Sequence, residues 1–174
     1  MSPARAAKFR SKEPNMTQVT LICVGTLKES YWRQALAEYE KRLSAFCRFR
    51  VEELSEERIP DEQDPARVEA ALRAEGERIL ARIPSGAYRI ALCIEGRAYS
   101  SEELASVLRK AEDQCGRIAL IIGSSHGLSP AVKNAADLRL SFSPLTFPHQ
   151  MVRVMTAEIL YRCFSINAGR CYHK

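Results

Sequence analysis

The sequence lacks any long apolar run. Its uninterrupted apolar segments are short, as in Ile118 to Ile122, which has the length of a β-strand. A helix that spans a bilayer needs roughly 18 or more apolar residues in a row, so we exclude a membrane span. The N-terminus also shows no secretory signal, and we therefore expect a cytoplasmic protein.

Metal-binding and disulfide patterns are missing as well. The six cysteines form no CxxC pair, and the three histidines lie far apart, at His126, His149 and His173. No second ligand stands at helical spacing from these histidines, so we expect no metal site. Three cysteines lie in or beside apolar segments, where cysteine behaves as a small hydrophobic residue: Cys23, Cys93 and Cys115.

Two common nucleotide-binding motifs are absent. No GxGxxG follows the first apolar segment, in which Gly25 stands alone, and GxxxxGK[ST] occurs nowhere. The sequence therefore gives no support to a Rossmann dehydrogenase or a P-loop NTPase.

What the sequence does contain is typical of one globular domain. The chain has 174 residues, of which 46% are hydrophobic and 27% are charged. Residues 1–15 are polar and show no apolar period, so we expect a disordered leader there and a single domain over residues 16–174. The net charge of +5 comes mainly from the two ends of the chain. A basic C-terminal end suits phosphate binding, and equally a solvated helix face.

Strand-like and helix-like segments alternate along the domain. We expect strands at residues 19–24, 48–54, 88–94, 117–122 and 138–142. We expect helices at residues 31–46, 65–83, 101–114 and 150–164, and a short one from residue 130, with N-caps at Ser30, Asp64, Ser101 and Ser129. This pattern predicts an α/β fold with a mostly parallel sheet of about five strands, helices on both faces, and residues 117–122 at its centre.

Three loops follow the third, fourth and fifth expected strands: IEGRAYS, IIGSSHGLSP and FSPLTFPH. In open α/β sheets, ligands bind outside the carboxyl ends of the strands. Gly96, Gly123 and Gly127 would let backbone groups approach a ligand closely, which suits a nucleoside or an amino-acid moiety. The alternative is that these glycines only form tight turns.

The second of these loops also matches a serine hydrolase motif. Residues 123–127 read GSSHG, which fits GxSxG with Ser125 as the nucleophile, and Asp137 and then His149 or His173 follow in hydrolase order. A nucleophile elbow needs a helix directly after the serine, whereas Ser129 and Pro130 predict a later start. A serine hydrolase is therefore the weaker alternative.

The segment SPLTFPHQMVRV, residues 143–154, is more specific than packing alone requires. Together with LKESYWRQALAEYEKRL, AEGERIL and the terminal CYHK, it resembles the RlmH family of SPOUT-class RNA methyltransferases. The resemblance covers residues 19–174, which is the whole chain except its leader.

The resemblance implies a SPOUT-type fold in which a C-terminal trefoil knot forms the cofactor site. It implies a homodimer that uses S-adenosyl-L-methionine to methylate ring nitrogen 3 of a pseudouridine in 23S ribosomal RNA, on the assembled 70S ribosome. The last expected helix carries an apolar stripe that would face the sheet in part and a second subunit in part: Met151, Val152, Met155, Ile159 and Cys163. A ribosome-associated RNA-binding module without catalysis is the alternative.

The resemblance also implies site residues. The cofactor would contact Leu92, Gly123, Ser124, Ser143, Pro144, Leu145, Thr146, Phe147 and Pro148. The RNA and the methyl acceptor would contact His149, Arg153, Tyr172, His173 and Lys174. Ser124 and His126 depart from the family pattern, which has a second glycine and then often an acidic or amide residue. A positive φ at Ser124 would weaken cofactor binding.

Overall fold

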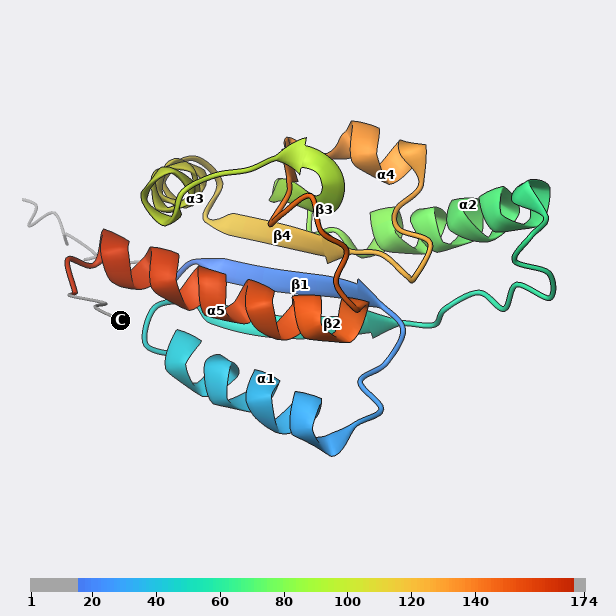
Figure 1. Cartoon of the computed structure of the whole chain (residues 1–174). Helices are drawn as coiled ribbons and strands as arrows, with labels where there is room; N and C mark the ends of the chain where they lie inside the picture. Colours follow the sequence, from blue (N-terminus) through green and yellow to red (C-terminus); the bar gives the residue numbers. More distant parts are fainter. Residues whose placement is uncertain (1–15, 171–174) are drawn as a thin grey trace, which may run out of the picture.

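The strands expected from the sequence are all present, and they form one parallel sheet. The computed structural model describes residues 16–170, with strands β1 (Gln18–Val24), β2 (Arg48–Leu54), β3 (Tyr88–Arg97), β4 (Arg117–Ile122) and β5 (Leu138–Leu140). The strand order is β2-β1-β4-β3-β5, and every neighbouring pair is parallel (Figure 1). The predicted central position of β4 is confirmed, and its residues from Ile118 onward are all buried.

Helices cover both faces of this sheet, as predicted. On one face lie α1 (Ser30–Leu43), α3 (Ser101–Cys115) and α5 (His149–Asn167), and on the other lie α2 (Pro65–Arg82) and α4 (Pro130–Ala135) (Figure 1). Successive residues of β1 therefore enter two different cores: Leu21 packs in the same cluster as Leu160 of α5, and Ile22 in the same cluster as Ile79 of α2.

Two of the predicted helix caps are confirmed. The Asp64 carboxylate accepts a hydrogen bond from Ala66 N at 3.0 Å at the start of α2, and the Ser129 hydroxyl accepts one from Val132 N at 3.4 Å at the start of α4. The other two expectations were wrong by one residue. Ser100, not Ser101, caps α3 in a capping box, and α1 begins at Ser30 itself.

The edge of the sheet near β5 differs from the prediction. β3 continues past its expected end to Arg97, because it pairs with β5 again after a bulge, and Arg97 lies opposite Leu140. Gly96 allows this close approach, since a Cβ atom there would lie 2.7 Å from the carbonyl carbon of Leu140. β5 ends at Leu140, earlier than expected. The threading of a trefoil knot in this region stays a prediction.

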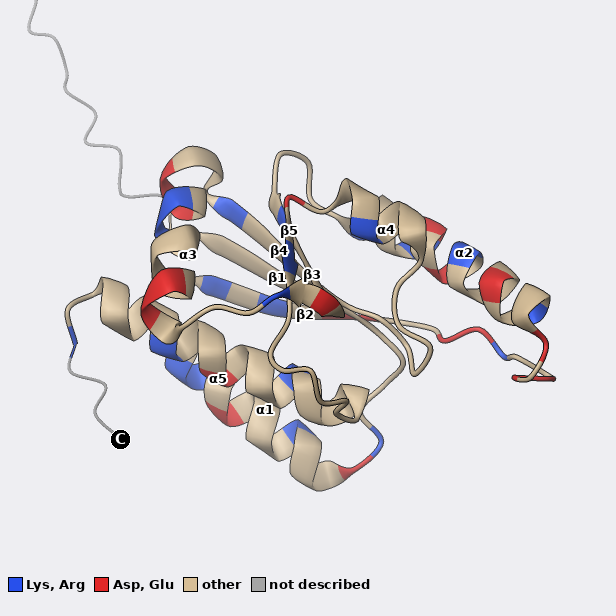
Figure 2. Ribbon diagram, turned by 45° about the horizontal axis from the view of Figure 1, so that its top comes forward, with Lys and Arg blue, Asp and Glu red and all other residues tan. Residues whose placement is uncertain are grey.

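The surface of the described chain carries both signs of charge. Figure 2 shows acidic and basic residues interspersed along α2. No helix of residues 16–170 is long and apolar enough to cross a membrane. The predicted leader, residues 1–15, lies outside the described residues.

The described cysteines are all free thiols. Cys115 is exposed, contrary to expectation, while Cys23, Cys47 and Cys163 are buried and Cys93 is half-buried.

Candidate functional site

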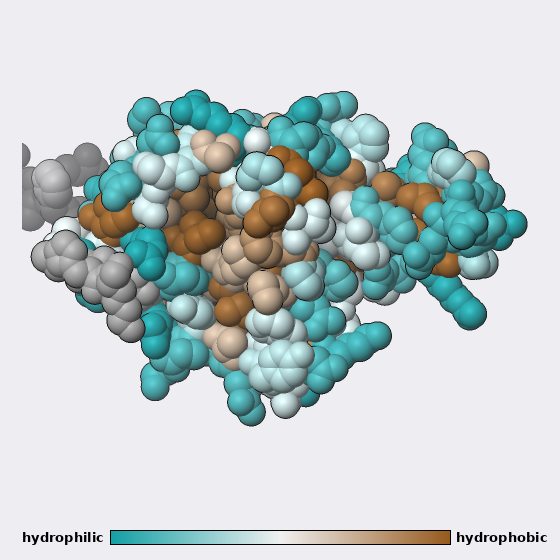
Figure 3. All heavy atoms as spheres, viewed as in Figure 1, coloured by the Kyte–Doolittle hydropathy of each residue, from teal (hydrophilic) through white to brown (hydrophobic). Residues whose placement is uncertain are grey.

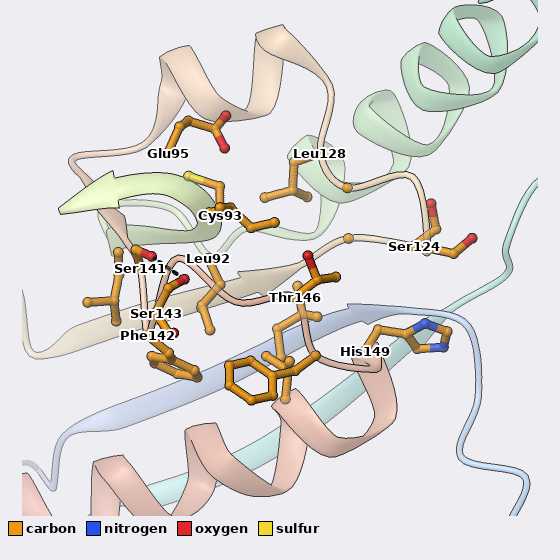
Figure 4. Close-up of a pocket in the computed structure, with 18 of the residues that line it drawn as sticks. Leu92, Cys93, Glu95, Ser124, Leu128, Ser141, Phe142, Ser143, Thr146 and His149 are labelled. Carbon is orange, nitrogen blue, oxygen red and sulfur yellow. Dashed lines mark hydrogen bonds between the residues drawn. The ribbon is translucent and has the colours of Figure 1, made fainter. Parts of the chain in front are cut away.

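A cavity of about 300 Å³ lies where the loops after β3, β4 and β5 meet (Figure 4). Seven of the residues predicted to bind the cofactor line it: Leu92, Gly123, Ser124, Ser143, Leu145, Thr146 and Phe147. Pro144 and Pro148 are not among its lining residues, although they belong to the same loop. The three loops singled out in the sequence therefore build one site.

The loop after β4 is a tight turn that requires glycine at its first position. A Cβ atom on Gly123 would lie 2.0 Å from the carbonyl oxygen of Gly127, far inside van der Waals contact. Gly127 N donates to Ser124 O at 2.9 Å, and Gly127 itself has a φ of 88°. No non-glycine residue among those described has a positive φ, so the backbone at Ser124 accepts a serine without strain.

The loop after β5 is held by its own side chains. The Ser141 hydroxyl donates to Ser143 O at 3.1 Å, and the Ser143 hydroxyl accepts from Leu145 N at 3.0 Å. Figure 4 shows Phe142, Ser143 and Thr146 of this segment on one side of the cavity and Leu128 on the other. Leu145 is 68% exposed, although it lines the cavity. The segment thus offers both apolar and hydroxyl groups to a ligand.

His149 lies at the edge of the cavity, as the first residue of α5. It is half-buried, and burial together with the Arg153 charge lowers its pKa below the ordinary value of 6.5. Lys28 also lowers this pKa, whereas Glu56 opposes the shift. A neutral imidazole at pH 7 can accept a proton, which suits the predicted place of His149 beside a methyl acceptor.

Arg153 lies one helical turn beyond His149 and is fully buried. Its Nη1 donates to Glu53 Oε1 at 2.8 Å, and its Nη2 donates to Val24 O at 2.8 Å and Gly25 O at 2.9 Å. This corrects the expected RNA contact: in the described chain, the guanidinium ties the end of β1 to β2 and has no exposed surface. Arg153 thus contacts the backbone at the end of β1 and lowers the pKa of His149.

The hydrolase alternative finds little support in this geometry. α4 begins at Pro130, so no helix follows Ser125 directly. Asp137 accepts two hydrogen bonds from the Arg89 side chain, both at 2.9 Å, and one from Arg89 N at 2.8 Å. Ser125 Oγ lies 3.2 Å from His126 Nδ1, but the nearest carboxylate, Glu62, is 3.9 Å from that ring and mostly exposed. Among the described residues, Asp137 is therefore paired with Arg89 rather than with a histidine, and His173 lies outside them.

Some site residues were not predicted, and others lie outside the described residues. Glu95 and Lys133 form an ion pair at the edge of the cavity, where Lys133 lowers the pKa of the Glu95 carboxyl through a hydrogen bond. No sequence motif marks this pair, because β3 and α4 meet only in the fold.

Tyr172, His173 and Lys174 lie beyond the described residues, so their predicted roles stay predictions.

Comparison with known proteins decides the family. The family model described as Predicted SPOUT methyltransferase matches residues 17–173. Ribosomal RNA large subunit methyltransferase H of Ligilactobacillus salivarius is 46% identical over 157 residues, which cover 90% of this chain and 99% of that protein. The same enzyme of Clostridium novyi is 45% identical over 157 residues, with the same coverage. This chain belongs to the SPOUT methyltransferase family.

Membership in the SPOUT methyltransferase family covers the whole described domain, and the resemblance found in the sequence is confirmed. Ser124 lies in the loop after β4, where its side chain is turned away from solvent and 8% of the residue is exposed. His126 lines the cavity beside it.

Proposed function

We propose that the chain transfers a methyl group from S-adenosyl-L-methionine to ring nitrogen 3 of a pseudouridine in 23S ribosomal RNA, on the assembled 70S ribosome in the cytoplasm. The observation that carries this proposal is the cavity itself, built by the loops after β3, β4 and β5 of a SPOUT methyltransferase domain. The curated relatives named above are ribosomal RNA methyltransferases of the large subunit.

The cavity suits such a cofactor. Its volume of about 300 Å³ is at the lower end of the range for small-molecule sites. Leu92, Ile122 and Leu140 supply an apolar surface of the kind that accepts an adenine ring, and Thr146 and the loop backbone supply polar groups. The cofactor would bring an activated methyl group, so the chain has to bind, orient and exclude water rather than form a covalent intermediate.

His149 is the described side chain best placed to take the proton from ring nitrogen 3. Its imidazole is neutral at pH 7 because burial and Arg153 lower its pKa. A Cβ atom on Gly25 would lie 3.7 Å from His149 Nε2, 3.6 Å from Glu56 Oε2 and 3.5 Å from Arg153 Nη2, so the three groups converge above the end of β1. Arg153 thereby keeps His149 in its proton-accepting form.

This assignment predicts a pH dependence. Because the pKa of His149 lies below its usual value, the methylation rate should stay level as the pH falls through about 6.5 and then drop about tenfold per pH unit below the shifted pKa. His149→Gln should lower the plateau and remove this acidic limb, as measured by initial rates of methyl transfer. An unchanged profile in His149→Gln would mean that another group titrates.

The length of the C-terminal tail favours a role for it in the site of a second subunit. Arg170 N donates to Ser165 O at 3.0 Å, so the described chain ends beside the last turns of α5. Ser165 and His149 are separated by about 24 Å along that helix, at 1.5 Å per residue. The four residues that follow Arg170 span at most about 14 Å. That backbone span falls short of His149 in the same chain, so we assign Tyr172, His173 and Lys174 to the partner's site in a homodimer.

Half-buried apolar side chains support this dimer. Cys163 of the predicted stripe is fully buried within the chain, and Val152 and Ile159 pack against the core. Met151 and Met155 are only half-buried. Figure 3 shows apolar residues gathered at the centre of the face on which α5 lies, whereas the projecting end of α2 is mostly hydrophilic. An isologous contact across α5 would cover this apolar surface.

The experiment that tests the proposal is methyl transfer from S-adenosyl-L-methionine to 70S ribosomes that lack the modification. We expect label in 23S ribosomal RNA, and none in naked RNA or in proteins. Ribosome binding without transfer would favour the non-catalytic RNA-binding module instead.

A further inference from the structure

Glu75 is a buried carboxylate with no place in the chemistry described above. It lies in the middle of α2, on the face of the sheet opposite α5, and is 3% exposed. Its helix neighbours Gly76 and Ile79 are the other buried residues of α2. Burying a charge is costly unless it is fully hydrogen-bonded, so the partners of this carboxylate show what it is for.

One carboxylate oxygen holds the cofactor loop. Ser124 Oγ donates to Glu75 Oε2 at 2.9 Å, and this is a bond between two buried side chains. The main chain of Ser124 accepts from Gly127 N, so the serine is fixed at both its side chain and its backbone. α2 packs closely behind this loop: a Cβ atom on Gly76 would lie 2.3 Å from Ser129 Oγ. The loop after β4 is therefore anchored to α2 through Glu75.

The other carboxylate oxygen holds the segment between β2 and α2. Glu57 N donates to Glu75 Oε1 at 2.9 Å, and Arg78 binds the same segment at Ser55 O and at the Glu57 carboxylate. This segment also carries Glu56, whose carboxylate lies next to His149. A single side chain thus connects the loop that would bind the cofactor with the segment beside the residue that would accept the proton.

We propose that Glu75 is a positioning residue for methyl transfer, which fixes the cofactor loop and the segment between β2 and α2 in one arrangement. The proposal rests on the proposed function and adds to it a residue outside the cavity. It also explains why a serine suits position 124, because its hydroxyl donates a hydrogen bond to the Glu75 carboxylate that a glycine could not.

The test is a double-mutant cycle between Ser124→Ala and Glu75→Gln, with the full chain throughout. Ser124→Ala removes the bond, Glu75→Gln leaves at most a neutral bond in its place, and both change the side-chain volume little. Each should weaken binding of S-adenosylmethionine by about fivefold, as measured by calorimetry. The loss of affinity in the double variant should be smaller than the product of the two single losses, because both changes act on the same bond. Glu77→Gln is the matched control, since Glu77 is exposed on the same helix and should bind as the wild type does.

A second readout separates this proposal from the proposed function. Amide hydrogen exchange of residues 123–127 in the free protein should accelerate in Ser124→Ala and in Glu75→Gln, and less than additively in the double variant, whether or not the wild type binds the cofactor. For turnover, kcat should fall along with the affinity in Glu75→Gln, because only this change also weakens the bond to Glu57 N beside His149. Additive effects, or loop exchange that stays at the wild-type rate in both variants, would overturn the role of Glu75. A wild type that binds no cofactor would overturn only the proposed function.

Discussion

Replacing Gly123 with alanine is expected to weaken the binding of S-adenosylmethionine by about a hundredfold or more. A Cβ atom at this position would lie 2.0 Å from Gly127 O and 2.4 Å from Gly127 C, and both are backbone atoms that cannot rotate away. The loop would have to move by about 1 Å to relieve the collision, and displacements of that size commonly cost about two orders of magnitude. Calorimetry with the purified variant measures the loss directly.

Gly86→Ala is the matched control for this substitution. Gly86 has a φ of 70° in the turn before β3, and nothing lies within 4 Å of a Cβ atom built on it. Alanine there should cost about 1–2 kcal/mol of stability through backbone strain and leave the cofactor affinity unchanged. If Gly123→Ala bound the cofactor within a few-fold of the wild type, the loop after β4 would not be part of the binding site.

Removing the last four residues is expected to lower methyl transfer by at least about a hundredfold, while the affinity for S-adenosylmethionine stays within a few-fold. The cofactor loops lie upstream of the cut. Truncation after Arg170 also keeps the contact of its guanidinium with the Phe46 ring, at 4.7 Å, so the end of α5 stays intact. A tyrosine, a histidine and a lysine together suit recognition of an unstacked nucleotide, by stacking, hydrogen bonding and phosphate contact.

Mixed dimers test whether the C-terminal tail completes the site of its own subunit or that of the partner. A truncated chain paired with a Gly123→Ala chain has one intact cofactor loop and one intact tail, on different subunits. If the tail acts beside His149, which it is too short to reach within its own chain, this heterodimer should recover about half of the wild-type activity, as one of two sites is complete. An inactive heterodimer, or full activity of the truncated homodimer, would show that the acceptor site is built without the partner's tail.

The fold was largely predictable because its signals are local. Short β-branched segments and capping residues such as Asp64 and Ser129 act within a few residues of chain, and they placed most strands and helices close to their observed positions. The extension of β3 to Arg97 was not predictable in this way. It depends on pairing with β5 after a bulge and on the close approach at Gly96, and both arise only when distant segments meet.

The candidate site was predictable where a loop motif carries it and not where a buried contact does. The segment around Thr146 marked one wall of the cavity directly, and most of its predicted residues line it. The sequence suggested a surface role for Arg153, because nothing local shows that Glu53, 100 residues earlier, pairs with it. Glu75 stood within AEGERIL, yet its bond to Ser124 spans 49 positions and appears only in the structure.

The most direct measurement of the central claim is the identity of the modified nucleoside. Ribosomes from cells that lack this methyltransferase would be incubated with the protein and S-adenosyl-L-methionine carrying a deuterated methyl group, and the 23S ribosomal RNA digested to nucleosides for mass spectrometry. The account predicts one new labelled nucleoside, a pseudouridine methylated on ring nitrogen 3, that is absent with Gly123→Ala. Label on another base, or no label from a protein that binds both the cofactor and the ribosome, would contradict it.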